Sequence, residues 1–329
     1  MRSFGIKESC AMFLTRLAAI LFMALFAGTI AAQRYPAQPI KIFVTAVGAP
    51  DLISRVLGEK MGEALGQPIV VEARVGGSGS VAGEIVARAA PDGHTLLLCT
   101  DAMLTITPHV IAKMSFNPNK DFAPIATLAS SELFLAVGPN QPYKTIPEFI
   151  EFAKKARPPL AYGSNGIGGQ HHLTMEMFKA RAGIDLLHVP YKGATPAATA
   201  AITGEVAALF SGGAAGPLIR SGRLRALAVA GSKRVAALPE VPTVGEFLPG
   251  FANSVWLALC APRLTPEPVL SRLRAEINKP LATLDVKEKF NRAGGLDPLI
   301  TTPAEFAEMI REGYEKYGKL VKELGLRVD

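Results

Sequence analysis

The chain has 329 residues, of which 49% are hydrophobic and 19% charged, so it can bury a large core and is neither disordered nor fibrous. Two domains are expected at this length, because one hydrophobic core seldom grows beyond about 250 to 300 residues. The formal net charge of +7 comes from basic residues that never cluster beyond pairs, which argues against nucleic-acid binding.

Residues 1–31 have the pattern of a cleaved secretory signal. Basic residues precede an apolar run from Leu17 to Ile30, which is shorter than the ~20 residues a membrane-spanning helix needs, and small residues follow. We expect cleavage after Ala31 or Ala32, with an uncleaved anchor as the alternative. Removal of the signal leaves 32 basic and 27 acidic residues, a net charge of +5 that suits a small anionic partner.

After Tyr35, short β-branched or leucine-rich runs alternate with segments of helical periodicity, which indicates an α/β fold. The continuous apolar character of these runs predicts parallel sheets covered on both faces. In chain order, the expected strands are 40–45, 69–73, 95–100, 133–137, 160–163, 186–189, 206–210, 224–230 and 255–261. The expected helices are 51–65, 81–90, 145–155, 170–182 and 195–203, followed by helices that begin near Thr265 and Thr302.

Side chains at two helix starts predict caps. Asp51 is expected to cap the first helix, and Thr302 with Glu305 to form a capping box before the last one.

Two alternating blocks of similar size, followed by a final strand and helices, predict two lobes joined by two crossing segments. We place the crossings near 130–131 and 253–254. Residues 32–130 and 254–329 would then form lobe 1, and residues 131–253 lobe 2. A cleft between the lobes is the expected ligand site.

Glycine-rich loops follow several of the expected strands, at the sheet edge where open α/β folds bind ligands. Each loop precedes a helix, so backbone N–H groups and a helix N-terminus can face an anion without a fixed positive side chain. Several converging loops would hold a carboxylate, although each one could also be only a tight turn. The loops are 47–50, 76–80, 163–169, 191–193 and 211–213.

One of these loops imitates a dinucleotide-binding motif. Gly77 to Ala82 fits G-x-G-x-x-A between a strand and a helix, and Asp101 ends the next strand, where a ribose-binding acid would fall. This pattern offers an alternative function, that of an exported NAD-dependent oxidoreductase. The export signal argues against it, and so does the position of the loop after the second strand rather than the first.

Catalytic and metal-binding patterns are weak. His171 and His172 are adjacent and therefore about 100° apart on a helix, which is poor spacing for ligating one metal ion, and the chain has no nucleophile-elbow motif. Cys99 and Cys260 lie in apolar strand-like runs and are expected to stay free thiols, although export would allow them to pair. We therefore expect a binding protein with no enzymatic activity, cofactor or metal. A ligand-free interaction protein is the other alternative.

A series of short motifs in fixed order covers nearly the whole chain after the signal, from Tyr35 to about Leu326. They read YPAQPI (35–40), LGQPIVVE (65–72), APDGHTLL (90–97), DFAPI (121–125), YGS (162–164), QHHL (170–173), HVPYKG (188–193), GRLRALAV (222–229) and LPEVPTV (238–244). Together they resemble the tripartite tricarboxylate transporter substrate-binding family, periplasmic receptors often called Bug proteins.

The resemblance implies a type II periplasmic-binding-protein fold, a Venus flytrap of two lobes with two crossover segments. It also implies location in the periplasm and delivery of a small organic carboxylate to an integral-membrane permease of the tripartite tricarboxylate transporter type. A sensor protein that reads the closed form is a second kind of partner that it allows. The ligand contacts implied are Val47, Gly48, Ala49, Asp51, Gly77, Ser78, Gly79, Ser80, Thr100, Asp101, Ser164, Asn165, Gln170, His171, Tyr191, Lys192, Gly193, Ser211 and Gly212.

The chain departs from the family pattern at two loops. The first loop reads TAVGAPD (45–51), with fewer glycines than is usual, so fewer free N–H groups can approach a carboxylate. Phe210-Ser211-Gly212 stands where the family often has Phe-Asp-Asn. The missing acid would otherwise pair with an ammonium group, so its loss argues against an amino-acid ligand in that loop.

Overall fold

The computed structural model describes residues 35–45, 49–74, 79–213, 215–235, 238–294 and 296–326. The expected signal, residues 1–31, lies outside these ranges. The same is true of four expected ligand contacts: Val47, Gly48, Gly77 and Ser78.

Among the described residues, six strands form the sheet of the first lobe. They are β1 (Ile40–Val44), β2 (Ile69–Ala73), β3 (Thr95–Thr100), β4 (Phe122–Glu132), β10 (Ser254–Pro262) and β11 (Leu296–Pro298). Their order across the sheet is β11-β4-β10-β3-β1-β2. The strands β1, β2 and β3 are parallel, whereas β10 is antiparallel to both of its neighbours and β11 is antiparallel to β4.

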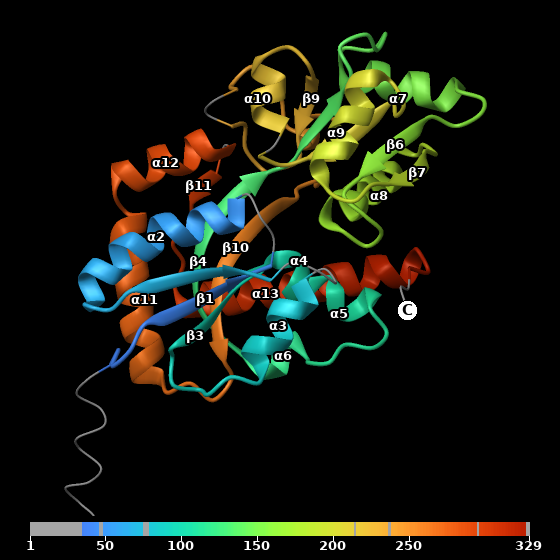
Figure 1. The fold of residues 1–329 in the computed structure, drawn as a ribbon. Helices are drawn as coiled ribbons and strands as arrows, with labels where there is room; N and C mark the ends of the chain where they lie inside the picture. The colour runs from blue at the N-terminus through green and yellow to red at the C-terminus, as the bar shows by residue number, and fades with distance from the viewer. Residues whose placement is uncertain are drawn as a thin grey trace, which may run out of the picture.

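The second lobe holds a sheet of five strands within the same ranges. They are β5 (Phe134–Val137), β6 (Ala161–Ser164), β7 (Leu187–Pro190), β8 (Ala208–Ser211) and β9 (Arg225–Val229). Their order is β7-β6-β8-β5-β9, with β6 parallel to β7 and β8, and β5 antiparallel to β8 and β9. In Figure 1 the sheet of the second lobe is at the upper right, and that of the first lobe is below it and to the left.

Helices cover both faces of each sheet. In the first lobe they are α2 (Ala49–Leu65), α3 (Ser80–Ala87), α4 (Asp101–Thr105), α5 (Thr107–Val110), α6 (Pro118–Asp121), α11 (Glu267–Leu281), α12 (Leu284–Gly294) and α13 (Pro303–Glu323). In the second lobe they are α7 (Ile146–Lys155), α8 (Gln170–Ala182), α9 (Ala194–Thr203) and α10 (Ala215–Arg220). No helix of the described ranges is both long and apolar enough to cross a bilayer.

Both faces of the first sheet are buried, and this explains the apolar pattern of its strands. Ile42 and Leu98 belong to a cluster with residues of α2 and α11, while Leu97 and Cys260 belong to a cluster on the other face with residues of α3 and α13. A buried Leu or Ile side chain contributes about 1.5 to 3 kcal/mol relative to an exposed one, so these clusters hold the lobe together.

The expectation of purely parallel sheets is wrong, and β4 and β11 were not expected as strands. An apolar run that is buried on both faces has the same pattern whichever way its neighbours point. The antiparallel pair is instead required by the crossings, because β4 carries the chain out of the first lobe and β10 brings it back. The two strands pair from Glu132 and Ser254 to Phe122 and Pro262.

Helix starts partly follow the expected caps. Thr302 and Glu305 form the expected capping box at the start of α13. Asp51 does not cap α2, because that helix begins two residues earlier, at Ala49, and Asp51 lies in its first turn.

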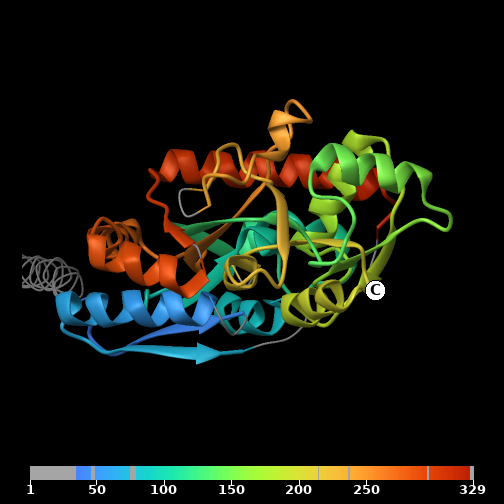
Figure 2. The same cartoon turned by 90° about the horizontal axis from the view of Figure 1, so that it is seen from above.

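The last helix lies mainly against the first lobe, where it contacts α4, α5 and β4. Seen from above, α13 runs along the side of the molecule opposite α2 and extends toward the second lobe (Figure 2). There its residues Tyr317 and Val321 share a small apolar cluster with Leu173 of α8. The helix therefore connects the lobes as well as covering a sheet.

Cys99 and Cys260 are buried free thiols, as expected. They lie on the neighbouring antiparallel strands β3 and β10, and the Cys99 thiol donates to the carbonyl of Ala258 at 3.4 Å. Burial raises the pKa of the Cys99 thiol well above its ordinary value, which makes it a poor nucleophile.

Candidate functional site

The expected ligand loops follow strands of both lobes, and the loop before α8 can be placed against the first lobe. Gly168, in the loop after β6, has φ +70°, and a Cβ atom there would lie 2.6 Å from Cγ1 of Val110 in α5. Only glycine fits both the conformation and this contact. The loop before α8 therefore packs directly against the first lobe.

Ser164 and Asn165 begin this loop. The Ser164 hydroxyl is buried and already bonded, with Nε2 of His188 at 2.7 Å and the N–H of Gly166 at 3.1 Å. The buried Oδ1 of Asn165, by contrast, has no hydrogen-bond partner among the described residues. The Ser164 hydroxyl thus stabilises the loop conformation. Oδ1 of Asn165 is the acceptor in this loop that lacks a described partner.

The helix α8 begins with two buried polar residues, Gln170 and His171. Nε2 of Gln170 donates to the hydroxyl of Tyr317 at 2.7 Å, while its Oε1 has no partner among the described residues. Burial lowers the pKa of His171 to about 4, so this imidazole is neutral at pH 7. The start of α8 therefore presents neutral polar groups rather than a fixed cation.

The carboxyl end of β8 carries Ser211, which is fully buried and whose hydroxyl has no partner among the described residues. The next residue, Gly212, lies beside the first crossing, since a Cβ atom there would be 3.6 Å from Oγ of Ser131. Buried polar groups nearly always find a hydrogen-bond partner. The free hydroxyl makes Ser211 the strongest candidate for a ligand contact in this lobe.

The remaining contacts expected in the second lobe lie at the start of α9. The Tyr191 hydroxyl donates to Oε1 of Glu205 at 2.6 Å, and Lys192 is exposed. Gly193 caps the helix with φ +118°, a conformation that favours glycine. The backbone of this turn, rather than the Tyr191 hydroxyl, is available to a ligand.

The first lobe contributes the starts of α2 and α3. The Asp51 carboxylate binds Nε and Nη2 of Arg55 at 2.8 and 2.9 Å, one helical turn further along. Gly79 caps α3 with φ +95° and lies close to Thr45, and Ser80 is the first residue of the helix. Asp51 is thus committed to its own helix, and Ala49 opens α2.

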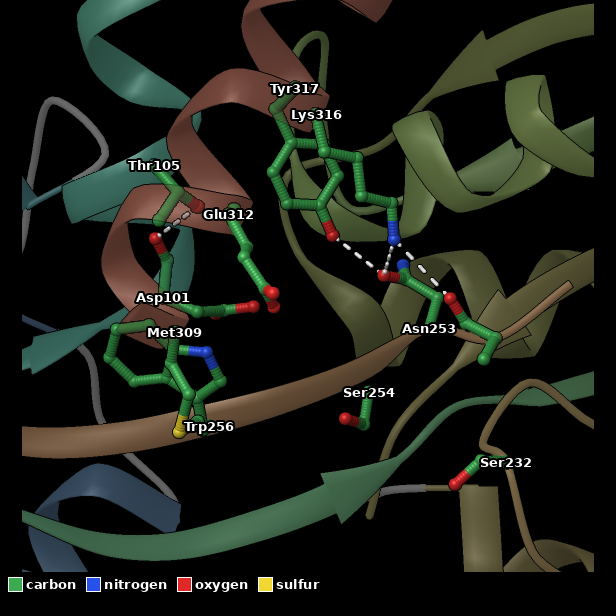
Figure 3. Close-up of a pocket in the computed structure, with 12 residues that line it drawn as sticks. Asp101, Thr105, Ser232, Asn253, Ser254, Trp256, Met309, Glu312, Lys316 and Tyr317 are labelled. Atoms are coloured by element: carbon green, nitrogen blue, oxygen red, sulfur yellow. Dashed lines mark hydrogen bonds between the residues drawn. The ribbon is translucent and has the colours of Figure 1, made fainter. Parts of the chain in front are cut away.

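Thr100 and Asp101, at the end of β3, have separate roles. The Thr100 hydroxyl caps α4 by accepting from the N–H of Met103 at 3.2 Å. The Asp101 side chain lines a cavity of about 250 Å³ between α4, α13 and the second crossing (Figure 3). Of the expected contacts that the structure describes, only Asp101 lines this cavity. Burial raises the pKa of its carboxyl group to about 7.

Sequence reasoning did not identify a hydrogen-bonded network beside this cavity. The Tyr317 hydroxyl donates to Oδ1 of Asn253 at 2.7 Å, and Nδ2 of Asn253 donates to the Thr174 hydroxyl at 2.7 Å. Nζ of Lys316 donates to the same Asn253 oxygen at 3.0 Å. The apolar face of the last helix includes Tyr317, but nothing in its spacing indicates that this side chain reaches the other lobe.

The described residues contain no group of three or more His, Cys, Asp or Glu side chains placed to hold a metal ion. The expected contacts that the structure describes include helix starts, amide and hydroxyl oxygens without a described hydrogen-bond partner, and a neutral histidine. Such groups suit hydrogen bonding to a small polar ligand.

Known proteins share both the sequence and the fold. Residues 53–326 match the family model described as tripartite tricarboxylate transporter family receptor. Protein BugT of Bordetella pertussis is 33% identical over 324 residues, which are 96% of this chain and 99% of that protein.

Two solved structures with bound ligands have the same fold. The adipate-bound structure of an R. palustris protein has a TM-score of 0.82 and 27% identity, and the match covers 89% of this chain and 100% of that one. The malate-bound structure of MatC from Rhodopseudomonas palustris has a TM-score of 0.76 and 29% identity, over 87% of this chain and 100% of that one. The fold is thus that of a two-lobed periplasmic binding protein, and the chain belongs to the tripartite tricarboxylate transporter receptor family, whose members are solute-binding receptors and not enzymes.

Proposed function

We propose that the chain is a periplasmic receptor that closes its two lobes on a small organic carboxylate and delivers it to a permease of the tripartite tricarboxylate transporter type. The observation that carries the proposal is the free hydroxyl of Ser211, buried at a strand end beside the first crossing. The adipate and malate bound to two proteins of the same fold support this class of ligand.

The charges at the proposed site favour an anion held by neutral donors. The helices α2, α8 and α9 are long enough to place a partial positive charge at their first turns. Burial keeps His171 neutral and the cation Lys192 is exposed, so the buried side-chain donors in the described part of these loops are uncharged. Closing the lobes removes water, which strengthens hydrogen bonds from N–H and O–H groups to a carboxylate.

The expected organisation of the chain belongs to the same proposal. Residues 1–31 would direct export and be cleaved, and lobes of residues 32–130 with 254–329 and of residues 131–253 would rotate about the two crossings. Tighter contact with the ligand in the closed form drives this rotation. A sensor protein that reads the closed form would be a second partner besides the permease.

The first test is a thermal-shift and calorimetric screen of the mature protein against dicarboxylates, tricarboxylates and aromatic acids. We expect a rise in melting temperature with at least one acid, because a ligand at 100 times its Kd stabilises the folded state by about 2.7 kcal/mol. The diol 1,6-hexanediol is the matched control for adipate and should have no effect. The absence of any acid that binds would contradict the proposal and favour a ligand-free interaction protein.

The second test compares two buried serines that both lack a hydrogen-bond partner among the described residues. Ser211→Ala should weaken binding of the best acid from the screen by about 0.5 to 1.5 kcal/mol, since it removes one hydrogen bond to the ligand. Ser54→Ala, inside α2, is the matched control and should leave the affinity unchanged. Equal affinities of the two variants, measured by calorimetry, would remove Ser211 from the site.

A further inference from the structure

The cavity that contains Asp101, here called the hinge cavity, lies where the second crossing meets the first lobe. Its floor is buried and includes Asp101, Trp256 and Tyr317, and its rim is exposed and includes Glu312 and Ser254. The described residues of the glycine-rich loops that we assign to the carboxylate do not line it. The hinge cavity is therefore lined by a different set of residues, although Tyr317 in its floor accepts a hydrogen bond from Gln170 at the start of α8.

Two carboxylates extend into this cavity. Figure 3 shows the side chains of Asp101, from α4, and Glu312, from α13, directed toward the same space. Asp101 is 2% exposed, and its Oδ1 has no hydrogen-bond partner among the described residues. A carboxylate without a partner is costly to bury, so this oxygen is suited to a donor that enters the cavity.

The nearest ammonium group does not satisfy Asp101. Nζ of Lys316 donates to Oδ1 of Asn253 at 3.0 Å and to the carbonyl of Ala252 at 3.3 Å, and Figure 3 shows it directed toward the crossing. Lys316 attracts the Asp101 carboxylate electrostatically, but it makes no hydrogen bond to Oδ1 of Asp101, which has no partner among the described residues.

The walls beside the carboxylates are apolar. Trp256 and Met309 line the cavity next to Asp101, and the indole ring can contact both an aliphatic chain and a cationic group. A volume of about 250 Å³ accommodates only a small molecule. Carboxylates next to an aromatic wall match the chemistry of an organic ammonium ion.

We propose that the hinge cavity binds a small molecule through its primary ammonium group, which donates to the carboxylates of Asp101 and Glu312 while its carbon chain contacts Trp256. Because Ala252 and Asn253 of the crossing line the same cavity, an occupant would also affect the movement of the lobes.

Trp256 makes the proposal directly measurable, since it is the only tryptophan of the chain and lines the cavity. The purified protein is titrated with n-butylamine and with glycine, which separate a simple amine from an amino acid as the source of the ammonium group, and with 1-butanol as a neutral control. We expect the tryptophan fluorescence to change with at least one of the two ammonium compounds and not with the alcohol.

Substitutions then test the two carboxylates. Glu312→Gln and Asp101→Asn should each raise the ammonium concentration needed for half of the fluorescence change about tenfold or more. The reason is that each substitution removes a charge-assisted hydrogen bond to the ligand. Glu315→Gln is the matched control, because Glu315 is exposed on the same helix and pairs with Arg311, and it should respond like the wild type. The exposed position of Glu312 ensures that at least one informative variant folds.

The proposal is overturned if neither ammonium compound changes the fluorescence at millimolar concentration, or if both carboxylate substitutions leave the response intact. Its failure is distinct from a failure of the carboxylate receptor, because the acid screen is run on the same protein and on Glu312→Gln. If an acid binds and neither ammonium compound does, only the proposal for the hinge cavity is wrong. If an ammonium compound binds and no acid does, only the proposed carboxylate site is wrong.

Discussion

Asp101→Asn is expected to stabilise the folded protein at pH 8 and to change its stability little near pH 4. The carboxyl group is buried, and burial raises its pKa from 3.8 to about 7. Between these values the unfolded chain loses the proton and the folded protein keeps it, so the wild type loses stability as the pH rises. The accumulated cost above pH 7 is roughly 4 kcal/mol at most, and asparagine avoids it because it carries no charge.

Urea unfolding at pH 4, 6 and 8 measures this effect. The difference in unfolding free energy between Asp101→Asn and the wild type should grow with pH and level off above pH 7. Asp185→Asn is the control, since Asp185 has an 82% exposed side chain and the same chemical change. A difference that is independent of pH, or a wild type that is the more stable protein at pH 8, would contradict the burial argument.

Local patterns in the sequence predicted most elements well. The strands 69–73 and 95–100 and the helix 170–182 were expected with the bounds they have. In these segments, β-branched runs and helical periodicity report directly on which residues are buried. The short helices α4, α5 and α6 were missed, because segments of four or five residues do not complete a periodic pattern.

Whether neighbouring strands run parallel or antiparallel was harder to predict from the sequence. The apolar run of β10 gives no sign that it is antiparallel to β3 and β4, because both of its faces are covered in either case. The two crossings expected near 130–131 and 253–254 carry the constraint that the strand pattern lacks, since one crossing leaves the first sheet and the other returns to it.

In the expected site too, features set by neighbouring residues could be predicted from the sequence, and contacts between distant residues could not. Glycine turns at Gly79, Gly168 and Gly193 have the positive φ angles that such loops require, and a local motif is enough to predict them. Asp101 was expected as a ligand contact, but the sequence gives no sign of the hinge cavity that it lines, because a helix more than 200 residues further along the chain forms one wall of that cavity. Contacts over such distances leave no spacing pattern in one sequence.

Tyr317→Phe is expected to destabilise the protein by about 2 to 3 kcal/mol and to weaken carboxylate binding. The hydroxyl accepts from Nε2 of Gln170 and donates to Oδ1 of Asn253, both at 2.7 Å. Since Oε1 of Gln170 already lacks a partner among the described residues, the substitution leaves the whole buried amide unpaired. It also removes the hydrogen bond that joins α13 to α8 and leaves only their apolar contact, so the lobes become more mobile and lose more conformational entropy when they close.

Tyr143→Phe is the matched control, because the Tyr143 hydroxyl is also buried but donates to the carbonyl of Ala207 at 3.0 Å, within the second lobe. It should cost about 1 kcal/mol of stability through one lost hydrogen bond and leave the affinity for the acid unchanged. Urea unfolding, calorimetry and small-angle scattering of the two variants separate the effects. A link between the lobes must alter the free energy of bringing them together, and therefore the affinity for the acid. If both variants bind the acid as the wild type does, the prediction is wrong, and the Tyr317 network stabilises the fold without controlling closure.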